Sequence, residues 1–84
     1  MEVTESYIKP HGRLFTDGRV VCWGKGRDWK LILLAAFERA FRAQGGKAYA
    51  VVLMEGGRPA TSAVKSIVAD AAGRLGIERI EWIN

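Results

Sequence analysis

Residues suited to catalysis or metal binding are scarce in this sequence. Its 84 residues include one cysteine, Cys22, and one histidine, His11. A single cysteine excludes an internal disulfide and leaves no cluster of thiols for a structural metal. Cys22 lies within an apolar run, which favours a buried, unreactive thiol, and His11 stands between Pro10 and Gly12, which favours a polar turn residue. We therefore expect no catalytic residue, no metal site, no cofactor and no enzymatic activity.

A long apolar run is also absent. None reaches the roughly 18 residues that a membrane-spanning helix requires, and the acidic stretch 1–5 differs from the basic start of a signal peptide. We therefore expect a cytoplasmic protein with no membrane association. The composition, 49% apolar and 26% charged, is typical of a globular protein. A chain of 84 residues has room for one modest core, so we expect residues 1–84 to form a single domain.

Positive charge is concentrated in one part of the chain. Residues 9–47 contain nine lysines and arginines against three acidic residues, a net charge of +6, whereas residues 48–84 are balanced. A basic half on a small domain fits a polyanionic partner such as nucleic acid. It fits equally well a solvated basic surface that keeps the protein in solution.

The first third of the sequence predicts a β-hairpin. The runs 13–16 and 19–23 flank Asp17-Gly18, and an Asp-Gly pair between apolar runs is typical of a type I′ turn. Residues 1–6 are polar, and we expect them to be frayed.

Two helices and two further strands follow the hairpin. Asp28 is a suitable N-cap for an apolar helix over residues 28–44, which Gly45-Gly46 ends. The uncharged run Ala48–Met54 predicts a strand buried on both faces. A loop, a second helix over 60–75 and a last strand over 77–83 complete the chain.

The order of elements is therefore β-β-α-β-α-β, an α/β fold. Right-handed crossovers make the last three strands parallel. We expect a mixed four-stranded sheet that begins with a hairpin, with both helices packed on the sheet.

Two strand-to-helix loops carry glycines and cations. Parallel strands end at one edge of a sheet, so the loops 24–27 and 56–58 should open there, each at the start of a helix. Glycine backbone, cationic side chains and a helix N-terminus together favour phosphate. The predicted nucleic-acid-binding residues of this edge are Gly24, Lys25, Gly26, Arg27, Lys30, Gly56, Gly57 and Arg58. Neither loop has a nucleotide-binding signature. Trp23 and Trp29 flank the first loop, where each could stack on a base or belong to the core.

Other reactive groups near these loops lack partners. Glu55 is the one carboxylate beside the second loop, and a lone carboxylate holds Mg²⁺ poorly. Thr61 and Ser62 have no histidine placed to activate them as nucleophiles.

Two stretches of the sequence share a pattern with a known family. Residues Val20–Lys25 predict an apolar strand ending in Gly-Lys, and residues Gly57–Val64 read Gly-Arg-Pro-Ala-Thr-Ser-Ala-Val at the start of the second helix. From Val20 onward the chain thus resembles the Alba family of small basic chromatin and RNA-binding proteins, which has a strand ending in Gly-Lys and a Gly-Arg-Ala-Ile-Ser-Lys-Ala-Val-like run at these places. The C-terminal domain of bacterial translation initiation factor three has the same β-α-β-α-β order. The resemblance implies nucleic-acid binding through Lys25 and Arg58, usually as a homodimer.

The chain departs from the Alba pattern at three points. The family's second lysine after Gly-Lys is here Gly26, with Arg27 next. The spacing between the two loops is longer, and the family's C-terminal strand pair, whose arm reaches the minor groove, is missing. We expect the hairpin 13–21 to replace that arm, with Arg13 and Arg19 as its reaching residues.

The sequence thus predicts a small basic homodimer that binds DNA or RNA mainly through the phosphate backbone. Two alternatives stay open. One is a protein-binding regulator or inhibitor that uses the wide apolar helix 28–44. The other is a small nucleotide-binding protein.

Overall fold

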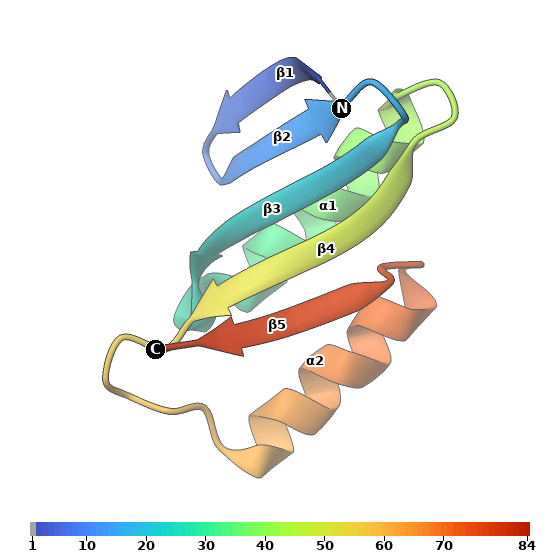
Figure 1. The fold of residues 1–84 in the computed structure, drawn as a ribbon. Helices are drawn as coiled ribbons and strands as arrows, with labels where there is room; N and C mark the ends of the chain where they lie inside the picture. Colours follow the sequence, from blue (N-terminus) through green and yellow to red (C-terminus); the bar gives the residue numbers. More distant parts are fainter. Residues whose placement is uncertain (1) are drawn as a thin grey trace.

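The computed structural model describes residues 2–84, and over this range the chain forms five strands and two α-helices (Figure 1). The strands are β1 (Val3–Ile8), β2 (His11–Phe15), β3 (Arg19–Lys25), β4 (Lys47–Met54) and β5 (Arg79–Ile83). The helices are α1 (Trp29–Arg42), preceded by the 3-10 turn η1 (Gly26–Asp28), and α2 (Ser62–Arg74). One mixed sheet has the order β1-β2-β3-β4-β5. The first three strands pair antiparallel, and β3, β4 and β5 pair parallel.

The predicted α/β fold with a mixed sheet, a hairpin and two helices is confirmed, but the predicted strand number is wrong. Residues 3–8, which were expected to be frayed up to residue 6, form β1 and pair with β2. Pro10 does not interrupt a strand, because it lies in the two-residue turn between Ile8 and His11. β1 is an edge strand with exposed side chains at most positions, and its β-branched and aromatic residues Val3, Thr4, Tyr7 and Ile8 favour the strand conformation. Met1 lies outside the described residues.

The turn that joins β2 to β3 differs from the predicted type I′ turn. Gly18 has a φ of 90°, but Asp17 does not have a positive φ. The Gly18 N–H donates a hydrogen bond of 2.9 Å to the Phe15 carbonyl. This geometry is a three-residue loop with a bulge at the glycine. Glycine is required there for a second reason, because a Cβ at position 18 would overlap the carbonyl oxygen of Gly45.

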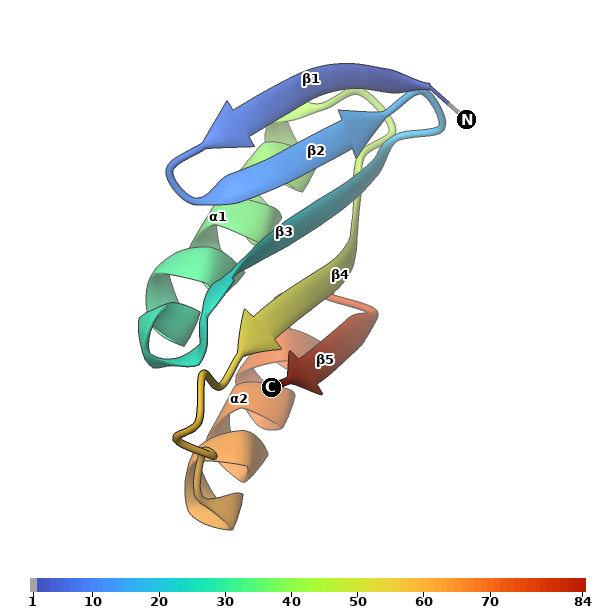
Figure 2. The same cartoon turned by 60° about the vertical axis from the view of Figure 1, so that its left-hand side comes forward.

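Both helices pack on the same face of the sheet. Figure 1 shows α1 behind β3 and β4, and Figure 2 shows α2 behind β5. Two right-handed crossovers that advance in one direction, from β3 to β4 to β5, produce this arrangement. We call the covered side the helix face. Its buried core consists mainly of Val20, Cys22, Ile32, Leu33, Ala36, Val51, Leu53, Val68 and Ala72.

One cation, Arg39 of α1, is held among the first three strands on the helix face. Its Nη1 donates a hydrogen bond of 3.3 Å to the Cys22 sulfur. Its guanidinium lies 4.0 Å from the centroid of the Tyr7 ring. Gly12 leaves the necessary space, because a Cβ there would lie 2.7 Å from Arg39 Nη1 and 2.9 Å from the Val21 carbonyl oxygen. Arg39 therefore connects α1 to β1, β2 and β3.

Burial changes the acidity of the two groups that Arg39 contacts. Desolvation raises the pKa of the Cys22 thiol, although the Arg39 hydrogen bond and charge act in the opposite direction. Desolvation, followed by the hydrogen bond and charge of Glu5, raises the pKa of Tyr7 to about 12. Cys22 is fully buried, as expected for a core thiol.

Candidate nucleic-acid interface

The three parallel strands end at one level, which we call the carboxyl edge. Lys25 of β3 pairs with Met54 of β4, and Met54 pairs with Ile83 of β5. The loop to α1 begins after Lys25 and the loop to α2 begins after Met54. Both predicted loops therefore open from the same edge, and Figures 1 and 2 show them leaving it on neighbouring strands.

The glycines of the two loops serve different purposes. At Gly24 an added Cβ would lie 2.7 Å from Ile32 Cδ1, and at Gly26 it would lie 3.1 Å from the Trp82 ring. These two glycines make room for α1 and for β5. Gly56 and Gly57 have φ values of 59° and 84° with nothing within 4 Å of an added Cβ. Of the four predicted glycine positions, only the two in the second loop therefore combine a left-handed backbone with open space around it.

Glu55 organises the second loop from within. Its carboxylate accepts a hydrogen bond of 2.7 Å from the Ala60 N–H and lies 3.4 Å from Lys65 Nζ. Its side chain is only 10% exposed. The Glu55 carbonyl also accepts a 3.1 Å hydrogen bond from the Arg58 N–H. The loop is thus folded around the carboxylate, while Arg58 stays exposed.

The two helices begin differently at the carboxyl edge. The Thr61 hydroxyl accepts a hydrogen bond of 3.2 Å from the Val64 N–H and caps α2. Asp28 stands at the predicted N-cap position of α1, but it makes no side-chain cap hydrogen bond within residues 2–84. Instead, η1 leads the chain into the helix. The capping role predicted for Asp28 is therefore wrong, while its position is right.

The predicted phosphate-contacting cations are all exposed. They are Lys25, Arg27, Lys30 and Arg58. Within the described part of the chain, the ion pairs closer than 4 Å involve none of these four cations. Their basic partners are Arg19, Arg42, Lys65, Arg74 and Arg79. None of the four cations of the carboxyl edge is therefore held in an ion pair there, although the exposed Asp28 follows Arg27 and lines the same hollow as Lys25.

The hairpin does not form a projecting arm, so that prediction is wrong. Its strands β2 and β3 lie inside the sheet order. Arg13 lies over Trp23, with 5.7 Å from its guanidinium to the ring centroid. Arg19 lies at the opposite end of β3 from Lys25, where it forms a 3.0 Å ion pair with Asp17. Arg13 and Arg19 are thus placed on the sheet and away from the carboxyl edge.

The second side of the sheet carries a surface that was not predicted from the sequence. No helix of residues 2–84 packs on it, and we call it the open face. Side chains directed to this face alternate with core residues along each strand. They include His11, Arg13, Arg19, Val21, Trp23, Lys25, Lys47, Tyr49, Val52 and Arg79. The signal was present in the sequence as the alternation of polar or aromatic residues with buried ones along 19–25.

Trp23 is the central aromatic residue of the open face. It is half-buried and stacks on His11, with ring centroids 6.0 Å apart and an interplanar angle of 10°. His11 is a strand residue of β2 and not a turn residue. Trp29, by contrast, packs against the core on the helix face. Trp29 therefore belongs to the core, whereas Trp23 lies on the open face.

A hollow of about 440 Å³ lies beside Trp23 at the carboxyl edge. Its walls come from the β1–β2 turn, the end of β3, the start of α1 and Met54, and include His11, Lys25 and Leu31. The hollow therefore joins the open face to the first loop.

Tyr49 is the second aromatic residue of the open face. Val20 pairs with Ala48 and Val21 pairs with Ala50, so Tyr49 is the extra residue of a β-bulge. The Arg19 guanidinium lies 4.6 Å from the Tyr49 ring centroid. Hydrogen bonds to Glu81 and then to Tyr49 raise the pKa of Arg79. Tyr49 is thus set between two cations.

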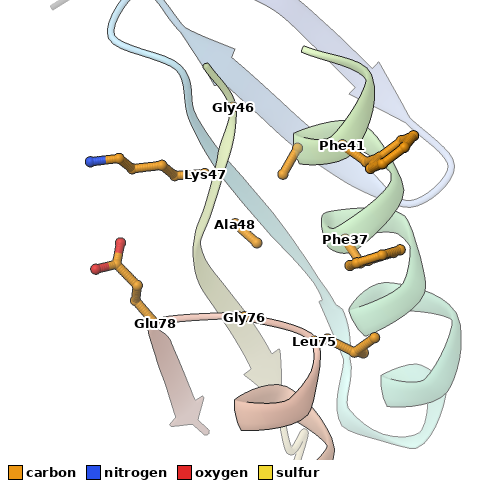
Figure 3. Close-up of a pocket in the computed structure, with 9 residues that line it drawn as sticks. Phe37, Phe41, Gly46, Lys47, Ala48, Leu75, Gly76 and Glu78 are labelled. Atoms are coloured by element: carbon orange, nitrogen blue, oxygen red, sulfur yellow. The ribbon is translucent and has the colours of Figure 1, made fainter. Parts of the chain in front are cut away.

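The outer side of α1 is strongly apolar. Leu31, Leu34 and Phe41 are 59%, 58% and 81% exposed. A second hollow, of about 360 Å³, lies beside Phe37, Phe41 and Leu75. Figure 3 shows the two phenylalanines on α1, with Lys47 projecting to the opposite side of the sheet.

No protein-family model, no curated protein and no solved structure matches this chain. Over residues 2–84, no helix is long and apolar enough to cross a membrane. The same residues contain no group of three or more His, Cys, Asp or Glu side chains placed to hold a metal ion.

Proposed function

We propose that this protein binds nucleic acid through phosphate contacts along the carboxyl edge. The observation that carries the proposal is the parallel register of Lys25 with Met54, which makes the two basic loops open from one rim. Lys25, Arg27, Lys30 and Arg58 are the proposed phosphate-contacting side chains. The exposed backbone of Gly56-Gly57 and the N-termini of both helices add partial positive charge at the same rim.

Three further features support this proposal. The chain carries a net charge of +4, which attracts polyanions. Among residues 2–84, none of the four cations has an acidic side-chain oxygen within 4 Å that would compete with phosphate. The resemblance of Val20–Lys25 and Gly57–Val64 to the Alba family points to the same function and to an Alba-like fold.

The test compares salt dependence of binding in matched variants. Lys25→Ala and Arg58→Ala should each weaken binding to a labelled DNA duplex and reduce the slope of log K against log salt by about 0.9. Arg74→Ala is the control, because Arg74 is an exposed arginine near the end of α2, away from the carboxyl edge. Fluorescence anisotropy at several salt concentrations measures both quantities. The proposal is refuted if the folded Lys25 and Arg58 variants bind as the parent does.

The exposed apolar side of α1 favours a second function, association with another protein surface. Leu31, Leu34 and Phe41 form a row of large apolar side chains that a single copy leaves in water. A homodimer is the association that the Alba resemblance implies, and a regulatory partner is the alternative. Sedimentation of the parent and of Phe41→Ser separates these cases, because a dimer through α1 should dissociate in the variant. A parent that sediments as a monomer at all concentrations argues against the homodimer.

A further inference from the structure

The open face combines the aromatic rings of Trp23 and Tyr49 with a band of cations. Trp23 and Tyr49 lie on neighbouring strands, about 10 Å apart along the strand direction at roughly 3.3 Å per residue. Each ring has an arginine over it, Arg13 at 5.7 Å from Trp23 and Arg19 at 4.6 Å from Tyr49. Alternating rings and cations of this kind suit a ligand that alternates flat bases with phosphates.

The charge of the open face is suited to a polyanion. Its cations are Arg13, Arg19, Lys25, Lys47 and Arg79. Four acidic residues lie near them. Asp17 pairs with Arg19 and Glu81 pairs with Arg79, Glu78 projects beside Lys47 in Figure 3, and Asp28 lines the same hollow as Lys25. Within residues 2–84, Arg13, Lys25 and Lys47 have no acidic atom within 4 Å. The face therefore keeps an excess of positive charge around its aromatic rings.

The hollow beside Trp23 gives the face a place for a planar group. Its volume of about 440 Å³ falls in the range of about 300–1,000 Å³ that small-molecule pockets occupy. The stacked pair His11–Trp23 lines it, and Lys25 of the first loop borders it. A base that enters the hollow would thus have its phosphates directed toward the carboxyl edge.

We infer that the open face is a stacking platform for unpaired bases, and that the preferred ligand is a single-stranded polynucleotide. This inference rests on the proposed function and specifies its substrate class. In a duplex the bases are already stacked on one another, so a sheet surface with aromatic rings cannot reach them. A single strand offers free base faces to Trp23 and Tyr49 while its phosphates contact Arg13, Lys47 and the carboxyl edge.

The experiment compares a single strand with a duplex of the same length. Labelled twelve-nucleotide DNA and RNA strands of mixed sequence, and the DNA strand annealed to its complement, are titrated with the full chain by fluorescence anisotropy. Trp23→Leu removes the ring and keeps apolar bulk, whereas Trp23→Phe keeps a ring. Trp23→Leu should weaken single-strand binding about tenfold and change duplex binding less than twofold. Trp23→Phe should stay close to the parent, and the salt slope should not change, because no phosphate contact is lost.

A second variant keeps the test valid if Trp23→Leu does not fold. His11 is exposed, so His11→Ala should fold normally and should weaken only single-strand binding, about threefold.

Each result of these titrations has a defined meaning. If the parent binds neither single strands nor duplex at low salt, both the proposed function and this inference are overturned. If the parent binds but the folded variants at positions 11 and 23 match it on single strands, the inference alone is overturned and the carboxyl edge remains. Equal losses on single strand and duplex, or a changed sedimentation of free Trp23→Leu, overturn it as well, since they indicate a structural role or an interface between copies.

Discussion

The two faces of the sheet are built from alternate residues of the same strands and have opposite chemistry. On the helix face, Val20, Val51 and Leu53 are completely buried. On the open face their neighbours Val21 and Val52 are only half-buried and stand beside aromatic and cationic residues. Side chains alternate along a strand. Of two adjacent residues, one therefore contributes to the buried core and the next contributes to the candidate ligand surface. Substitutions at paired neighbours can therefore test this division directly.

The largest expected difference between the faces is at the end of β4. Leu53→Ala should reduce the free energy of unfolding by about 2–5 kcal/mol, because it removes fully buried methyl groups and leaves a cavity under α1. Val52→Ala, one residue away on the open face, should cost about 1 kcal/mol or less. Urea unfolding of both variants measures the two values. Similar losses at positions 52 and 53 would show that the open face is covered in solution.

An intermediate difference is expected between two arginines that each lie over an aromatic ring. Arg39 on the helix face contacts Tyr7 and donates to the buried Cys22 sulfur. Arg39→Gln should cost about 1–2 kcal/mol of unfolding free energy. Arg13 lies over Trp23 on the open face and is exposed, so Arg13→Gln should cost about 0.5 kcal/mol.

Binding should respond to these two arginines in the opposite order. Under the single-strand proposal, Arg13→Gln weakens polynucleotide binding, whereas Arg39→Gln leaves it unchanged in conditions where the variant is folded. Thermal unfolding and anisotropy on the same two proteins provide the comparison. A larger stability loss for Arg13→Gln than for Arg39→Gln would contradict the assignment of the two faces.

The apolar helix and the strands of the helix face could be predicted from the sequence, because both give a periodic pattern of hydrophobic residues. The α1 residues Ile32, Leu33 and Ala36 are buried, and the strand-to-helix loops open at one edge as the parallel register requires. The run Ala48–Met54 was expected to be buried on both faces, but Val52 is half-buried. An uncharged run predicts a strand, and it cannot tell whether a helix covers one side or two.

The open face was not predicted, for identifiable physical reasons. β1 has exposed side chains at most positions, so its pairing with β2 depends on backbone hydrogen bonds and not on a buried stripe. The pairing of β2 with β3 places His11 opposite Trp23, but the neighbours Pro10 and Gly12 favoured a turn at this position in the sequence. The roles of Gly12 and Gly24 were also hidden, because they depend on Arg39 and Ile32, which are distant in the sequence.

The smallest difference between the faces is expected in how the free energy of unfolding depends on pH. This difference is absent at pH 7 and develops only at alkaline pH. Burial raises the pKa of Cys22 above the ordinary value of 9.0, and desolvation with Glu5 raises the pKa of Tyr7 from 10.0 to about 12. Both groups are therefore neutral in the folded protein at pH values where they ionise in the unfolded chain. Their contribution to stability is complete below pH 9 and is lost as pH rises through the folded pKa values.

The free energy of unfolding should accordingly decrease above pH 9, by at most about 1.4 kcal/mol per pH unit for each group. The slope of the parent alone does not identify which group causes the decrease. Cys22→Ala should flatten the decrease that begins near pH 9, and Tyr7→Phe the part between pH 10 and 12, because each variant lacks the titrating group. Urea unfolding at pH 7, 9, 10 and 11 measures these slopes. If both variants keep the slope of the parent, the alkaline loss comes from groups other than Cys22 and Tyr7.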